Sequence, residues 1–118
     1  CVPISKITEC VKFAEEQAEK FGVRAPMVGH MGDGNFHVIL PFDPKNKESY
    51  KKIRAFNDTL IKKSLELNGT ITGEHGVGLH KKEYLLEQHP DNIPVMKSIK
   101  RTLDPNNIMN PGKIFDLN

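Results

Sequence analysis

The chain has 118 residues, 37% of them hydrophobic, which is enough for one domain of ordinary size with its own core. Its 17 basic and 15 acidic residues give a formal net charge of +2, and because the basic residues are scattered along the chain, nucleic acid is a poor candidate partner. No apolar stretch approaches the roughly 20 residues of a membrane span, so we expect a soluble globular protein without a membrane helix or signal peptide.

The N-terminal segment predicts an amphipathic helix over residues 3–21. Apolar side chains recur there at helical spacing with Glu and Lys between them, and Gly22 is a usual helix stop. The two cysteines, Cys1 and Cys10, lie in this segment and far from the histidine-containing motifs, so we expect reduced thiols rather than a disulfide framework or a zinc knuckle. Because the chain begins with Cys1 rather than Met, we expect it to be part of a longer polypeptide.

The next segment predicts a β-hairpin. Two short runs rich in Val, Ile and Phe, at 26–31 and 36–41, lie on either side of a Gly-Asp-Gly-Asn sequence. A two-residue turn at Asp33-Gly34 pairs His30 directly with His37. Opposed residues of an antiparallel pair point to one face with Cβ atoms about 5 Å apart, so the two imidazoles can share one metal ion.

The remaining elements complete an α+β pattern. A second amphipathic helix over 50–65 ends before Asn68-Gly69, a third strand follows at 70–72, and two shorter helices are expected at 81–88 and 93–103, before an irregular tail. We therefore predict a small antiparallel sheet, made of the hairpin and the further strand and packed with amphipathic helices.

A polar cluster, Glu74-His75, follows the predicted third strand. A His-x6-His spacing alone is weak evidence, and for His30 and His37 taken by themselves a cross-strand polar pair is the favoured interpretation. A carboxylate from a neighbouring strand end would complete a two-histidine, one-carboxylate set with open positions for substrate. The glycines around Glu74-His75 have alternative interpretations, a phosphate-binding nest or a tight corner.

Three motifs together resemble the C-terminal segment of FAD-linked oxidases of the vanillyl-alcohol-oxidase type. They are the segment 29–37 with sequence Gly-His-Met-Gly-Asp-Gly-Asn-Phe-His, the segment 73–78 with sequence Gly-Glu-His-Gly-Val-Gly, and the pair formed by 103–105 and 110–113. The D-lactate dehydrogenase, glycolate oxidase D subunit and D-2-hydroxyglutarate dehydrogenase branches are the most similar.

The resemblance implies that 1–118 is a single C-terminal segment, comprising part of a substrate cap and a tail, and that the N-terminal FAD-binding domain is absent from this chain. It implies that His30, His37 and Glu74 bind a divalent metal, zinc or manganese, that His75 is the catalytic base, and that Asn110 lies near the FAD. The isolated segment is then expected to be inactive.

The expected reaction of the full-length enzyme is oxidation of a small 2-hydroxy acid to the 2-oxo acid. Ile39 stands where members that resemble D-2-hydroxyglutarate dehydrogenase tend to have Asn, so the resemblance favours a D-lactate or glycolate type of substrate. The expected partners are the FAD domain of the same polypeptide and an unidentified electron acceptor, with homo-oligomerisation possible. The expected location is cytoplasmic in a prokaryote and mitochondrial in a eukaryote. Two alternatives stay open: a non-catalytic, metal-binding structural cap, and a metal-dependent hydrolase.

Overall fold

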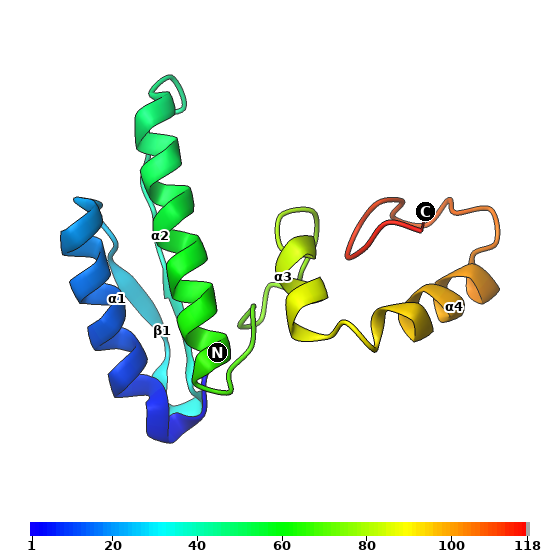
Figure 1. The fold of residues 1–118 in the computed structure, drawn as a ribbon, viewed down its shortest axis with the longest axis horizontal. Coiled ribbons are helices and arrows are strands. Elements are labelled where there is room, and N and C mark those ends of the chain that lie inside the picture. Colours follow the sequence, from blue (N-terminus) through cyan, green and yellow to red (C-terminus); the bar gives the residue numbers. More distant parts are fainter. Residues whose placement is uncertain (118) are drawn as a thin grey trace. The chain divides into compact units, whose positions relative to one another are not determined.

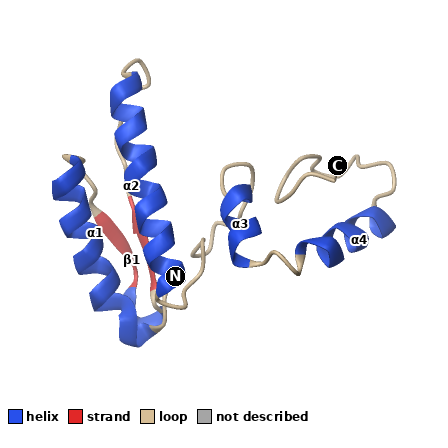
Figure 2. Ribbon diagram, in the orientation of Figure 1, coloured by secondary structure: helices blue, strands red, loops and turns tan. Residues whose placement is uncertain are grey.

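The computed structural model describes residues 1–117 and divides the chain into two compact units, Cys1–Glu74 and His75–Asn118. The elements in chain order are η1 (Ile4–Lys6), α1 (Ile7–Phe21), β1 (Met27–His30), η2 (Met31–Asp33), β2 (Asn35–Val38), α2 (Lys47–Glu66), α3 (Lys82–Gln88) and α4 (Ile93–Leu103). Helices and a small antiparallel sheet confirm the predicted α+β class (Figure 2). No helix in the described part of the chain has the length and apolar character that crossing a membrane requires.

In the first unit, α1 and α2 lie side by side against the hairpin (Figure 1). The helix that the sequence predicts at 3–21 is confirmed, with η1 as its first turn, and Gly22 ends it with a left-handed φ of 62°. Asn46 caps α2, because its side-chain oxygen accepts hydrogen bonds from the backbone N–H groups of Glu48 and Ser49.

The core of the first unit forms where both helices meet the N-terminal segment and the hairpin. Val2, Cys10 and Leu67 are buried there, and Phe36 of β2 packs against them. Successive side chains of a strand point to opposite faces of the sheet. The hairpin face that carries Phe36 therefore packs toward the helices. The face that carries the histidines is the other one.

The predicted hairpin exists, but its register differs by two residues from the prediction. His30 pairs with Asn35, and His37 pairs with Val28. The loop is not a two-residue turn at Asp33-Gly34, because η2 precedes Gly34, which alone adopts a left-handed φ of 74°. A shift of two residues preserves the alternation of faces, so the histidines still share one face, as diagonal rather than direct neighbours.

The predicted third strand at 70–72 is not formed in the described residues, where the sheet has two strands. The backbone N–H of Thr70 donates to the carbonyl oxygen of Cys1 at 2.8 Å, and the Ser64 hydroxyl donates to the Thr70 carbonyl oxygen at 2.9 Å. The Thr-Ile-Thr sequence has a high β propensity. Its hydrogen bonds, however, go to the N-terminal segment and to the end of α2, and not to a neighbouring strand.

The second unit contains α3 and α4, whose predicted positions at 81–88 and 93–103 are confirmed to within a residue. Its tail folds back on the segment before α3: the backbone N–H of Ile114 donates to the Gly78 carbonyl oxygen at 2.8 Å. The Lys82 ammonium group also forms an ion pair with Asp116 at 2.9 Å. These contacts hold the tail within its own unit.

Candidate metal centre

Three side chains of the first unit converge on one face of the hairpin, near the end closed by the 31–34 loop. The Nε2 atom of His37 lies 3.0 Å from one carboxylate oxygen of Glu74, and the Nε2 atom of His30 lies 3.9 Å from the other. The two imidazole rings are 6.4 Å apart between centroids and nearly perpendicular. Each of the three residues offers one potential ligand atom, and these three atoms all lie within 4.8 Å of one another.

The hairpin register explains how the two histidines meet. His30 is the last residue of β1 and is paired with Asn35, while His37 lies two residues further along β2. Residues two apart on a strand share a face, so both imidazoles project to the side away from the helices. The 31–34 loop therefore fixes which strand positions face each other, and its Gly34 approaches the Val2 backbone so closely that a Cβ there would lie 2.0 Å from the Val2 carbonyl oxygen.

Glu74 reaches this face from a separate segment, residues 69–74, which follows α2. Ile71 of that segment is 3% exposed and anchors it. Gly69 lies so close to the Cys1 carbonyl oxygen that a Cβ there would stand 2.3 Å from it. Since Cys1 and Val2 also join the 31–34 loop, through the hydrogen bond from the Val2 N–H to the Gly34 carbonyl oxygen at 2.9 Å, the N-terminal segment connects the two halves of the site.

The donor set fits a divalent cation. Two imidazole nitrogens and one carboxylate oxygen suit zinc, and they are also acceptable to manganese. The His37 side chain is 25% exposed, whereas those of Glu74 and His30 are 47% and 63% exposed, so one side of the cluster faces solvent. A three-residue set with an open side leaves room for exogenous ligands, which is typical of catalytic rather than structural metal sites.

The other two residues singled out from the sequence belong to the second unit. His75 is its first residue and directly follows Glu74 in the chain. Asn110 has a left-handed φ of 47° and lines a hollow of about 250 Å³ together with Met109 and Ile114. The structure therefore brings together His30, His37 and Glu74. His75 and Asn110 belong to the second unit and have defined positions only within that unit.

One residue near the site was not identified from the sequence. Asn35 is 8% exposed, is paired with His30, and lies on the same face of β2 as His37. Its side-chain oxygen is buried without a hydrogen-bond partner. The alternation Asn35-Phe36-His37 places it on the histidine face, but no local pattern indicates that its side chain lies against Gly73, which is remote in sequence.

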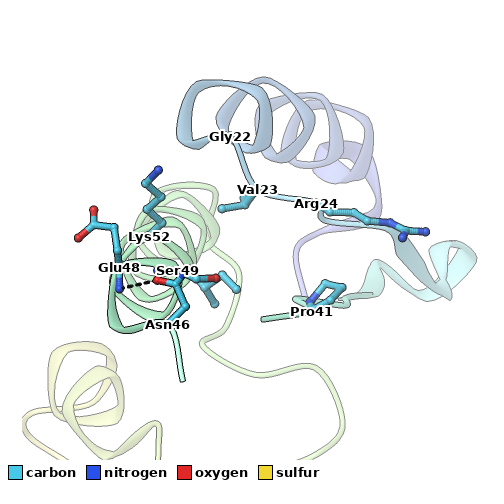
Figure 3. Close-up of a pocket in the computed structure, with 9 residues that line it drawn as sticks. Gly22, Val23, Arg24, Pro41, Asn46, Glu48, Ser49 and Lys52 are labelled. Atoms are coloured by element: carbon cyan, nitrogen blue, oxygen red, sulfur yellow. Dashed lines mark hydrogen bonds between the residues drawn. The ribbon is translucent and has the colours of Figure 1, made fainter. Parts of the chain in front are cut away.

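A separate hollow of about 230 Å³ lies between the start of α2 and the segments that flank the strands (Figure 3). Arg24, Pro41 and Lys52 line it, together with the capping residue Asn46, whose hydrogen bond to the Glu48 backbone is drawn there. None of the three converging side chains contributes to this hollow. It is a feature of the helix start and separate from the candidate metal centre.

Comparison with known proteins identifies the family. The family model described as FAD linked oxidases, C-terminal domain, matches residues 1–114. The chain is 40% identical over 118 residues to a probable mitochondrial D-lactate dehydrogenase of Danio rerio, covering 99% of this chain and 24% of the relative. It is 41% identical over 115 residues to glycolate oxidase subunit GlcD of Bacillus subtilis, covering 97% of this chain and 24% of the relative.

A third relative is a D-2-hydroxyglutarate dehydrogenase of Stutzerimonas stutzeri, which is 46% identical over 90 residues, covering 74% of this chain and 19% of the relative. The chain thus spans about a quarter or less of the length of these relatives. The match of the family model over nearly all of the chain is the decisive finding, and it agrees with the three sequence motifs. The chain belongs to the family of C-terminal domains of FAD-linked oxidases.

Proposed function

We propose that this chain is the C-terminal part of an FAD-dependent dehydrogenase that oxidises a small 2-hydroxy acid, of the D-lactate or glycolate type, to the 2-oxo acid. The observation that carries the proposal is the convergence of His30, His37 and Glu74, with ligand atoms within 4.8 Å of one another, in a chain of the FAD-linked oxidase family. The names of two relatives, a probable D-lactate dehydrogenase and a glycolate oxidase subunit, support the substrate class.

In this proposal His30, His37 and Glu74 hold one divalent cation, zinc or manganese. When bound, such an ion supplies Lewis acidity that lowers the pKa of a substrate hydroxyl group. The three side chains would hold the cation on its protein side. Because His30 and Glu74 are exposed, the solvent side stays open for the hydroxyl and carboxylate oxygens of a 2-hydroxy acid. Holding the substrate by both oxygens orients its α-carbon hydrogen in one direction.

His75 is the proposed base. A ring nitrogen of His75 takes the proton of the substrate α-hydroxyl, because an imidazole can accept a proton near neutral pH. FAD, held mainly by an N-terminal domain of the same polypeptide, supplies the acceptor for the hydride that leaves the α-carbon. Asn110 is the residue of this chain that we assign to the vicinity of the flavin.

Ile39 supports a small substrate over a dicarboxylate. Its backbone N–H donates to the Pro26 carbonyl oxygen at 2.9 Å, which continues the register of the hairpin, and so its side chain lies on the same face as His37. The Ile39 side chain is 51% exposed. An apolar side chain beside the metal centre offers no hydrogen bond to a second carboxylate, whereas the methyl group of lactate can contact it.

An exposed apolar stripe on α4 supports the presence of a partner domain in the full-length protein. Val95, Ile99 and Leu103 recur every fourth residue and are 60%, 55% and 76% exposed. Apolar side chains at this spacing form one face of a helix, and such faces are usually covered by another element. The FAD-binding domain of the same polypeptide is the partner that we propose.

Anaerobic flavin reduction in the full-length protein tests the proposal. We expect D-lactate or glycolate to bleach the flavin absorbance faster than D-2-hydroxyglutarate, and we expect chelation to abolish and Zn²⁺ or Mn²⁺ to restore the reaction. A protein without flavin, or a flavin that none of these acids reduces, contradicts the proposal. Unchanged reduction after complete removal of divalent ions contradicts the role of the three converging residues.

A further inference from the structure

The buried side chain of Asn35 is the feature of the first unit that the proposed mechanism does not use. Its oxygen atom Oδ1 is buried without a hydrogen-bond partner, and the residue as a whole is 8% exposed. An amide oxygen removed from water without a compensating hydrogen bond destabilises the folded state, and an apolar side chain of similar size would avoid this cost. Stability of the fold therefore does not explain an Asn at this position.

What the amide of Asn35 contacts is Gly73, the residue before Glu74. A Cβ added to Gly73 would lie 2.1 Å from Oδ1 of Asn35 and 3.0 Å from its Cγ, distances at which a real side chain cannot be placed without displacement. The φ of Gly73 is not in the left-handed region. The close approach of the Asn35 side chain, and not the backbone conformation, therefore favours glycine at this position.

The position of Asn35 gives this contact a consequence for the candidate metal centre. Asn35 is paired with His30 and lies on the same face of β2 as His37. Through Gly73 it also meets the segment that carries Glu74, whose carboxylate reaches 3.0 Å from His37. Asn35 thus belongs to the hairpin that supplies both imidazoles, and its side chain touches the segment that supplies the carboxylate.

We propose that Asn35 is a positioning residue of the candidate metal centre: its buried amide, lodged against Gly73, sets the position of the Glu74 carboxylate relative to His30 and His37. The inference rests on the proposed function, in which these three side chains hold one divalent cation. Residues that orient metal ligands contribute about 10–100-fold to metal affinity, because a ligand held in place loses little freedom on binding.

The test compares the affinity of the metal-free, full-length protein for Zn²⁺ and Mn²⁺, measured by competition with a chromophoric chelator. Gly73→Ala should raise the dissociation constant about 10–100-fold, because the new methyl group displaces the segment that carries Glu74. Asn35→Ala should also raise it, because that segment loses its support. In the double variant Asn35→Ala/Gly73→Ala the methyl group occupies the space left by the amide, so the affinity should recover above that of Gly73→Ala alone.

Gly32→Ala is the matched control, since a Cβ at Gly32 meets no atom within 4 Å, and it should leave the dissociation constant unchanged. The inference is wrong if Gly73→Ala binds the ions as tightly as Gly32→Ala, or if the double variant binds no better than Gly73→Ala. Should Gly73→Ala fail to fold, Asn35→Ala decides: wild-type affinity in that variant overturns the inference.

A further variant separates this inference from the proposed function. His37→Ala should abolish binding if the three residues hold the ion. If the wild-type protein and His37→Ala bind equally, the proposed metal centre itself fails. If His37→Ala abolishes binding while Asn35→Ala and Gly73→Ala leave it at the wild-type value, only the positioning role of Asn35 fails. Thermal unfolding of the metal-free variants supplies a second readout, because a purely structural role would lower the unfolding temperature without changing the affinity.

Discussion

His30 and His37 are diagonal neighbours on one face of the hairpin, and both approach the carboxylate of Glu74. If they share one ion, loss of either imidazole should remove the same interaction. We expect His30→Ala and His37→Ala in the full-length protein each to weaken metal binding by more than about 100-fold, beyond the effect of residues that only orient ligands. The double variant should be little worse than either single one, because residues that act as a unit are not additive.

Metal titration and flavin-reduction rates on the same three variants measure this effect, with His89→Ala as the control histidine outside the site. Independent, multiplying losses would show that the two histidines do not bind the same ion.

Glu74 and His75 are adjacent in the chain but have different proposed roles. Glu74→Gln should lose metal and activity together and regain part of both in excess metal, because the amide is a weaker ligand than the carboxylate. His75→Asn should retain the metal and lose about 10²–10⁴-fold in the rate of flavin reduction, the usual contribution of a general base. Metal content and single-turnover flavin reduction distinguish the two. If His75→Asn strips the metal and Glu74→Gln keeps it, the roles are reversed.

At the level of elements, Asp104 organises the turn that leads from α4 to Asn110. Its carboxylate accepts hydrogen bonds from the backbone N–H groups of Ile108 and Met109 at 3.0 and 2.9 Å, and it pairs with Lys100. Lys100 also donates to the Met109 carbonyl oxygen at 2.6 Å. The hydrogen bond from Lys100, followed by those from the two backbone N–H groups, outweighs burial and lowers the pKa of the Asp104 carboxyl below its ordinary value.

A lowered pKa in the folded state means that ionised Asp104 stabilises this turn. The contribution is complete above the unfolded-state pKa of about 3.9 and is lost as the pH falls through the folded-state value. We therefore expect Asp104→Asn to speed amide exchange of the 105–110 segment at neutral pH, and we expect the difference from wild type to vanish in acid. Hydrogen exchange with mass spectrometry measures this, with the exposed Asp91→Asn as the control. Equal exchange at neutral pH would show that the carboxylate does not hold the turn.

At the scale of the whole molecule, this chain spans 24% of the length of its D-lactate dehydrogenase and glycolate oxidase relatives. If FAD is bound mainly by the remainder of such a protein, the chain by itself should retain no stoichiometric FAD after gel filtration and should not turn over D-lactate. Absorbance at flavin wavelengths and a dye-reduction assay check both points. Retained flavin together with D-lactate turnover would show that residues 1–118 contain a complete catalytic centre.

The sequence by itself determined the elements whose signals are local. Helical spacing of apolar residues and the stop at Gly22 predicted α1, and the Asn68-Gly69 and Asp104-Pro105 stops predicted the ends of α2 and α4. The two-residue period of a strand was sufficient to place His30 and His37 on one face, because even a register error of two preserves the face.

The tertiary structure decided what depends on contacts between distant residues. The 31–34 loop is longer than the predicted turn, since Gly34 meets the backbone of Val2, a residue 32 positions earlier. Residues 70–72 form no strand, since the N–H of Thr70 is paired with Cys1. The approach of Glu74 to the imidazoles and the burial of Asn35 against Gly73 follow from the same non-local packing. Local propensities cannot determine such contacts, because each depends on where the rest of the chain places its partner.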